Sequence, residues 1–122
     1  MDPAADARLY RTLDGSMIHE LLHPDHDHIR GLSVAEATIA PGGRTHTHRH
    51  RVAEEIYYTL SGEGLLRLGP KSEQMRPGSI HLIEPGVDHN ATALAEAPLV
   101  FLCIATPPYS HDDTELTGSV EA

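Results

Sequence analysis

The sequence contains a single cysteine, Cys103, no tryptophan and no long hydrophobic run. One cysteine cannot form a disulfide within the chain, and this favours a reducing, cytoplasmic setting. The longest apolar run, residues 98–105, is far too short to span a bilayer. The chain also opens without a basic segment followed by an apolar one, so we expect no secretory signal.

Basic residues are scarce as well. Nine Lys and Arg against 18 Asp and Glu give a net charge of -9 with His neutral. An excess of negative charge repels phosphate backbones and anionic lipids, so we expect neither nucleic acid nor membrane as a partner. A length of 122 residues is enough for one hydrophobic core but not for two, which predicts one domain.

Ten glycines and nine prolines are spread along the chain. They separate short apolar and β-branched segments, and many short strands between turns predict a β-sandwich or a barrel. We interpret residues 1–7 as loosely attached, 70–77 as a polar connection and 108–122 as a flexible tail. The predicted strands are residues 9–13, 17–22, 32–39, 44–50, 56–60, 65–68, 79–83, 91–94 and 99–105.

Histidines are concentrated near the middle of the chain, in the stretch THTHRHRVAEEIYYTLSGEG at residues 45–64. Alternate side chains of a strand share a face, so His48 and His50 point the same way. A carboxylate from the adjoining strand would complete a set of ligands suited to a metal ion of intermediate softness. A solvated edge strand would show the same alternation, so the histidines alone do not decide between the two.

The spacing of the surrounding residues carries more information. Gly42 precedes His48 by six residues, His50 follows at plus two, Glu55 lies five further on, and Gly62 lies seven after that. This pattern resembles the first motif of the cupin family. Residues 78–89, GSIHLIEPGVDH, resemble the second motif, although the sequence departs from the family pattern at two positions that are not ligands. The second motif places Gly78, Gly86 and His89 in register, and the departures are Glu84 and Ala93.

The resemblance covers roughly residues 31–107 and implies an all-β double-stranded β-helix, or jelly-roll barrel. Residues 1–122 would form a single cupin domain with its core at 31–107 and N-terminal strands within 8–22. The family's ligands for one divalent transition metal ion per chain would be His48, His50, Glu55 and His89. Three imidazoles and one carboxylate leave a coordination position open and suit Fe, Mn, Ni, Co, Cu or Zn, among which the sequence does not choose.

Two residues that precede the expected ligands in the chain share their parity. Arg44 and His46 have the parity of His48, so they are expected on the same face. His46 is either an alternative ligand or a residue at the rim that supports a ligand, and we favour the second. His81 lies among apolar residues of both parities and has no predicted role. The histidine-rich segment 23–28 is either a second metal site or an exposed loop, and its Pro and Asp favour the loop.

The strands after the histidines offer other candidates. Tyr57 has the parity of Glu55 and is a catalytic candidate beside it, or else a core aromatic. Glu54 is expected to face away. Cys103 shares a face with Phe101, which the resemblance directs towards the metal, so Cys103 is a thiol in the pocket or a buried filler.

The resemblance implies a metal-dependent enzyme that acts on a small organic substrate, most often by oxidative, dioxygenase-like chemistry. Non-redox isomerisation or elimination of a sugar-like or carboxylated substrate is the first alternative. A non-catalytic sensor that binds a ligand in the same cavity is the second. We also expect a homodimer, held partly by the N-terminal strands around residues 9–22, because a lone jelly roll exposes strand edges.

Overall fold

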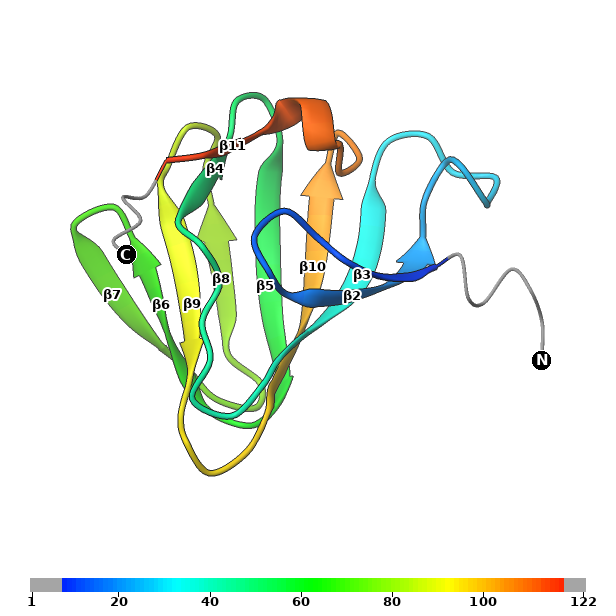
Figure 1. Cartoon of the computed structure of the whole chain (residues 1–122). Helices are drawn as coiled ribbons and strands as arrows, with labels where there is room; N and C mark the ends of the chain where they lie inside the picture. The colour runs from blue at the N-terminus through cyan, green and yellow to red at the C-terminus, as the bar shows by residue number, and fades with distance from the viewer. Residues whose placement is uncertain (1–7, 118–122) are drawn as a thin grey trace, which may run out of the picture.

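The computed structural model describes residues 8–117, which form an all-β protein with no α-helix in that range (Figure 1). No helix of these residues is long and apolar enough to cross a membrane. The elements are β1 (Leu9–Arg11), β2 (Met17–Leu22), β3 (Ser33–Ile39), β4 (His48–His50), β5 (Glu54–Ser61), β6 (Gly64–Leu68), β7 (Lys71–Met75), β8 (Ile80–Ile83), β9 (His89–Ala93), β10 (Leu99–Thr106), the 3-10 turn η1 (His111–Asp113) and β11 (Thr114–Leu116).

The strands form two antiparallel sheets. The first has the order β1-β2-β3-β10-β5-β8 and the second the order β11-β4-β9-β6-β7. From β3 to β11 the chain passes from one sheet to the other at almost every connection, as it does in a jelly roll. Figure 1 shows the strands running between an upper rim, crossed by η1 and β11, and the lower loop that joins β9 to β10. The predicted double-stranded β-helix is therefore confirmed.

The core lies between the two sheets. Alternate side chains along the strands point into it. On β5, Glu55, Tyr57 and Thr59 are buried, whereas Glu54 and Tyr58 on the opposite face are exposed. The inward face of each sheet contributes large apolar side chains to one buried cluster that also contains Tyr57. The cluster includes Ile39, Leu66, Met75, Ile83, Leu99 and Phe101.

One strand was not expected from the sequence. We predicted a polar connection at residues 70–77, but Lys71–Met75 form β7, which pairs with β6. Four of its five residues are exposed and only Met75 is buried. An edge strand with a polar outer row has no apolar alternation, so the sequence pattern did not reveal it.

The strand expected over residues 44–50 is shorter than predicted. Only His48–His50 is regular, and Arg44 forms an isolated bridge with Thr92. Thr45 is buried and His46 is exposed, so the alternation shifts by one residue before His48. The prediction that Arg44 and His46 share the face of His48 is therefore wrong, because a slip of one residue reverses every side chain.

The C-terminal segment also differs from the prediction. Residues 108–122 were expected to be a flexible tail, but within them η1 and β11 are ordered and β11 pairs with β4. Asp113 accepts hydrogen bonds from the backbone N–H groups of Val52 and Ala53, at 2.9 and 3.0 Å. These contacts with the loop between β4 and β5 hold the segment in place. Residues 118–122, and the predicted loose segment 1–7, lie outside the described residues.

Replacing Gly62 by alanine should destabilise the fold by about 2–4 kcal/mol. Gly62 has a φ of 76°, and a Cβ atom there would overlap the carbonyl oxygen of Pro98. Gly69 is a matched control, since its φ is 57° but a Cβ atom would meet nothing within 4 Å. Gly69→Ala should cost only about 1 kcal/mol. Urea unfolding measures both values, and an equal loss in the two variants would contradict the overlap.

Candidate metal centre

Four buried side chains from both sheets converge between β4, β5 and β9. His48 and His50 come from β4, Glu55 from β5 and His89 from β9. Each offers one ligand atom, and the four atoms lie within 4.8 Å of one another. The structure thus brings together the four residues that the cupin resemblance nominated as metal ligands.

Strand pairing explains why these residues meet. His48 lies directly opposite His89 in the antiparallel pair of β4 and β9, and His50 lies two residues further along the same face. The chain then crosses to the other sheet within residues 51–53, so Glu55 faces the histidines across the core. The centre therefore joins the two sheets.

Each imidazole is oriented through its Nδ1 atom. The Nδ1 atoms of His48 and His89 lie 2.9 Å from the carbonyl oxygens of His46 and Val87, and a carbonyl can only accept. The Nδ1 atom of His50 lies 3.1 Å from the hydroxyl oxygen of Thr114, a hydroxyl that itself donates to the carbonyl of Ser110. The protons are thereby assigned to Nδ1, which leaves each Nε2 lone pair facing the centre.

A cation fits the atoms that face the centre. Nε2 of His50 and of His89 lie 3.0 and 3.4 Å from Oε1 of Glu55, yet none of these three buried atoms has a hydrogen-bond partner among the described residues. Buried polar atoms without partners are costly, because they have lost water and gained nothing. Nitrogen and oxygen lone pairs aimed at one point form the donor set of a divalent transition metal ion.

The charge of Glu55 agrees with that donor set. Burial by itself would raise the pKa of Glu55, but the adjacent His50 and His89 rings lower it well below its usual value. Burial, followed by the charge of His89, lowers the pKa of His48. Burial also works against a proton on His50, although the Glu55 carboxylate outweighs it and the net shift is upward. The carboxylate is therefore ionised, as a metal ligand must be.

Asp14 reaches the centre from the turn between β1 and β2, and the sequence analysis did not identify it. Its Oδ2 atom lies 3.6 Å from Nε2 of His48. Its Oδ1 atom accepts from the Thr12 hydroxyl at 2.5 Å, and from the backbone N–H and the hydroxyl of Ser16 at 2.9 and 2.7 Å. The residue lies between the predicted strands at 9–13 and 17–22, and nothing in the local pattern links it to histidines more than thirty residues away.

A cavity adjoins the cluster, and three predicted neighbours line it. Tyr57, Phe101 and Cys103 all face this cavity, as the parity of β5 predicted for Tyr57 and the cupin resemblance implied for Phe101 and Cys103. The Tyr57 ring centre lies 5.9 Å from that of His89. Burial, and then the charge of Glu55, raise the pKa of Tyr57 and of Cys103 well above their usual values. The phenol and the thiol are therefore protonated at neutral pH.

The other histidines singled out in the sequence lie outside the cluster. His46 is exposed and supports His48 only through its backbone carbonyl. His81 is buried elsewhere, with Nδ1 2.5 Å from Oε1 of Glu73 and Nε2 3.2 Å from Oγ of Ser79. The segment 23–28 forms turns, and most of its residues are exposed, as predicted for a loop. His23 is half-buried, with Nε2 3.2 Å from the Tyr109 carbonyl oxygen.

Comparisons with known proteins agree with this architecture. The family described as Cupin domain matches residues 35–105, which is more than half of the chain. An uncharacterized protein of Methanocaldococcus jannaschii is 42% identical over 107 residues, covering 88% of this chain and 86% of the relative. An L-ectoine synthase of Bordetella petrii is 29% identical over 94 residues, covering 75% and 69%. The crystal structure of a cupin-like protein from Thermotoga maritima superposes with a TM-score of 0.72 at 26% identity, covering 87% of this chain and 78% of that one. Sequence, fold and relatives thus show that this chain belongs to the cupin family.

Proposed function

We propose that the protein is a metal-dependent enzyme that transforms a small organic molecule at the centre formed by His48, His50, Glu55 and His89. One observation carries the proposal: three buried ligand atoms, which have no hydrogen-bond partner within residues 8–117, face one another beside a cavity. A structural metal site is usually closed by its protein ligands, whereas a site next to free space leaves room for a substrate. The metal would be one divalent ion of Fe, Mn, Ni, Co, Cu or Zn.

Oxidative, dioxygenase-like chemistry is the leading reaction class of the proposal. A bound iron, manganese or copper ion would supply redox chemistry, and any of the six ions would supply Lewis acidity. The chain itself supplies a small space with a protonated thiol and a protonated phenol on its wall, those of Cys103 and Tyr57. Such walls exclude bulk water from the reacting groups.

Non-redox isomerisation or elimination is the second candidate, and one observation favours it. Two carboxylates lie beside different histidines of the cluster, Glu55 beside His50 and Asp14 beside His48. Two such groups would allow one to take a proton from a substrate while the other returns a proton at a second position. In this reading Glu55 and Tyr57 are the catalytic residues contributed by β5, with Glu55 as the base and the Tyr57 phenol as a donor to the substrate.

Elemental analysis followed by oxygen-uptake screening tests the proposal. The purified protein should contain one equivalent of a transition metal per chain. Oxygen consumption with a small organic substrate would support the oxidative reaction, whereas product formation without oxygen consumption would support isomerisation or elimination. A protein that binds metal and ligands but turns over none of them is a sensor, and this outcome would refute the enzymatic proposal.

We also propose that the protein is a homodimer of the cytoplasm. β1 is an edge strand of the first sheet, and the N-terminal strands with the turn between them expose Leu9, Leu13, Met17, Leu21 and Leu22. Edges and apolar surface of this kind favour pairing with a second copy. Light scattering should give twice the mass of one chain, and Leu9→Lys with Leu21→Lys should give one chain. Leu65→Lys is the control, since this exposed residue lies on the second sheet. A monomer mass over a wide range of wild-type concentrations would contradict the proposal.

A further inference from the structure

Two adjoining hollows lie between the candidate metal centre and the surface. The inner cavity borders His48, His50 and Glu55 and has a volume of about 40 Å³. Each water needs about 10–15 Å³ by this measure, so the cavity has room for about three waters or a two-carbon compound. The outer groove is larger, at about 610 Å³. The two share four lining residues, which are Tyr10, Glu20, His23 and Tyr109.

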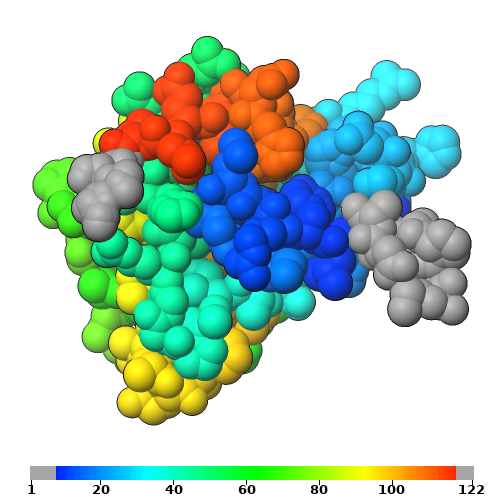
Figure 2. All heavy atoms as spheres, in the orientation of Figure 1, coloured from blue at the N-terminus to red at the C-terminus, as the bar shows by residue number. Residues whose placement is uncertain are grey.

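The N-terminal strands and the C-terminal segment form the walls of this path. Figure 2 shows the blue residues of β1 and β2 against the orange residues around η1 on the viewed face. The rings of Tyr10 and His111 meet there edge to face, with centres 6.4 Å apart. A ligand that reaches the metal centre therefore passes residues from both ends of the described chain.

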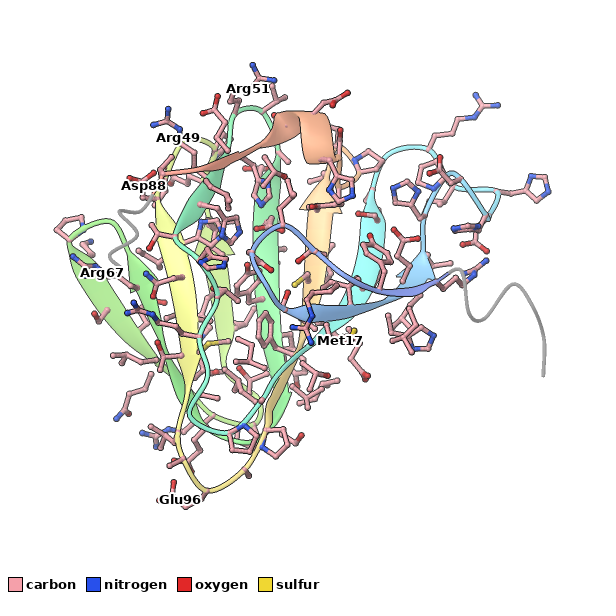
Figure 3. All side chains as sticks on the ribbon, viewed as in Figure 1. Met17, Arg49, Arg51, Arg67, Asp88 and Glu96 are labelled. Atoms are coloured by element: carbon pink, nitrogen blue, oxygen red, sulfur yellow. The ribbon has the colours of Figure 1, made fainter. Side chains whose placement is uncertain are left out.

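Apart from histidines, the ionisable carboxylate and basic side chains along the path are all acidic. Asp14, Glu20 and Glu55 line the inner cavity, and Asp25 and Asp112 line the outer groove. The nine Lys and Arg residues of the sequence all lie within residues 8–117, and none of them lines either hollow. Figure 3 shows three of them, Arg49, Arg51 and Arg67, projecting outward from the barrel.

Two of the acidic groups are fixed in place by neighbouring hydroxyls. Glu20 is buried; its Oε2 atom accepts from the Tyr10 hydroxyl at 2.8 Å, and its Oε1 atom lies 3.3 Å from Nε2 of His26. Asp14 is held through Oδ1 by Thr12 and Ser16. Its Oδ2 atom accepts no hydrogen bond among the described residues and lies next to His48. Oδ2 of Asp14 is therefore an acceptor of fixed position at the inner end of the path.

This distribution of charge disfavours anionic ligands. The Glu55 and Asp14 carboxylates together balance the two charges of a divalent cation, and Glu20 adds a further negative charge. An anion would lose its water beside like charges, with no Lys or Arg to replace the lost solvation. A neutral or cationic donor would instead gain a hydrogen bond to an ionised acceptor, which is the stronger kind.

We infer that the cavity binds small molecules that donate hydrogen bonds and carry no negative charge, such as vicinal alcohols and amino alcohols, with Asp14 as the acceptor that orients them. The inference rests on the proposed function in one respect, since it takes for granted that a small organic molecule enters this cavity. It excludes small carboxylates, which a metal centre lined by arginine or lysine would favour.

Binding of three two-carbon probes to the metal-loaded, full-length protein tests the inference. Ethylene glycol, ethanolamine and glycolate share a two-carbon skeleton with one hydroxyl and differ in the charge and donors of the second group, and titration followed by ligand-observed NMR gives their dissociation constants. Ethylene glycol and ethanolamine should bind at least about tenfold more tightly than glycolate. Asp14→Asn should weaken both by about tenfold, since it removes the ionised acceptor. Elemental analysis should show that this variant keeps its metal.

Glu96→Gln is the matched control, because it also removes one negative charge. Glu96 is exposed and lies in the loop at the end of the barrel away from η1 (Figure 3). The affinities of the Glu96→Gln variant for the three probes should equal those of the wild type. If the melting curve shows that Asp14→Asn fails to fold, the comparison of the three probes on the wild type still tests the inference.

Three results would overturn the inference: tighter binding of glycolate than of ethylene glycol, binding of none of the probes, or unchanged affinities in a folded Asp14→Asn variant. Different results would refute the proposed function. A protein that prefers the uncharged probes but turns over no substrate would refute the enzyme and leave the inference standing. Turnover together with a preference for glycolate would do the reverse.

Discussion

Replacing His48 and His50 together by alanine is expected to abolish stoichiometric metal binding. The double variant removes two of the four converging ligand atoms and leaves only Glu55 and His89. Two ligands cannot complete the three- or four-residue sites that hold transition metals in proteins. Elemental analysis of the purified variant should therefore find no stoichiometric metal, against one equivalent in the wild type.

A second double variant controls for the loss of histidines as such. His26→Ala with His28→Ala removes two imidazoles from the exposed loop at residues 23–28 and should retain the metal. A full equivalent in the His48 and His50 variant would show that the ligand assignment is wrong. The histidines of the loop would then become the next candidates, and the control variant would already show whether they bind the ion.

Glu55→Gln should keep the metal with weakened affinity but lose turnover by roughly a hundredfold or more, the usual scale for acid–base catalysis. Glutamine has nearly the shape of glutamate, so the oxygen that lies 3.0 Å from Nε2 of His50 stays in place. The substitution removes the negative charge and the ability to take up a proton. Three imidazoles suffice to hold the ion, which separates the loss of catalysis from the loss of metal.

Glu54→Gln serves as the control for this experiment. Glu54 is the adjacent residue of β5, but it lies on the exposed face of the strand. Its substitution should leave both metal content and turnover near the wild-type values. Full turnover in Glu55→Gln would show that Glu55 is not the catalytic base. A pure binding protein would have no turnover to lose, and its ligand affinity would follow metal occupancy in both variants.

Much of the strand pattern was accessible from the sequence because alternation is a local property. The opposite orientations of Glu54 and Glu55 follow from period two, and so does the common face of His48 and His50. The glycine, histidine and glutamate spacing indicated the family and nominated four residues that the fold brings together. The spacing is informative because, in one known fold, the turns bring residues at these positions into a single pocket.

Local patterns did not predict the structure correctly where the alternation of side chains is interrupted or absent. The chain between Thr45 and His48 shifts its alternation by one residue, so Arg44 and His46 do not line the pocket. β7 has an exposed, polar face and resembles a loop in sequence. Both cases are decided by the neighbouring strand, whose hydrogen bonds hold residues that have no intrinsic preference for that conformation.

Composition and spacing by themselves determined an acidic, all-β chain of the cupin kind with a candidate metal centre at its middle. Only the tertiary structure decided what else surrounds that centre. Asp14 comes from the turn after β1, and Thr114 reaches His50 across 64 positions of the sequence. Both contacts depend on the outer strands closing over the barrel, β1 and β2 beside β3 and β11 beside β4. No local pattern encodes such contacts, because their residues become neighbours only when distant strands pair.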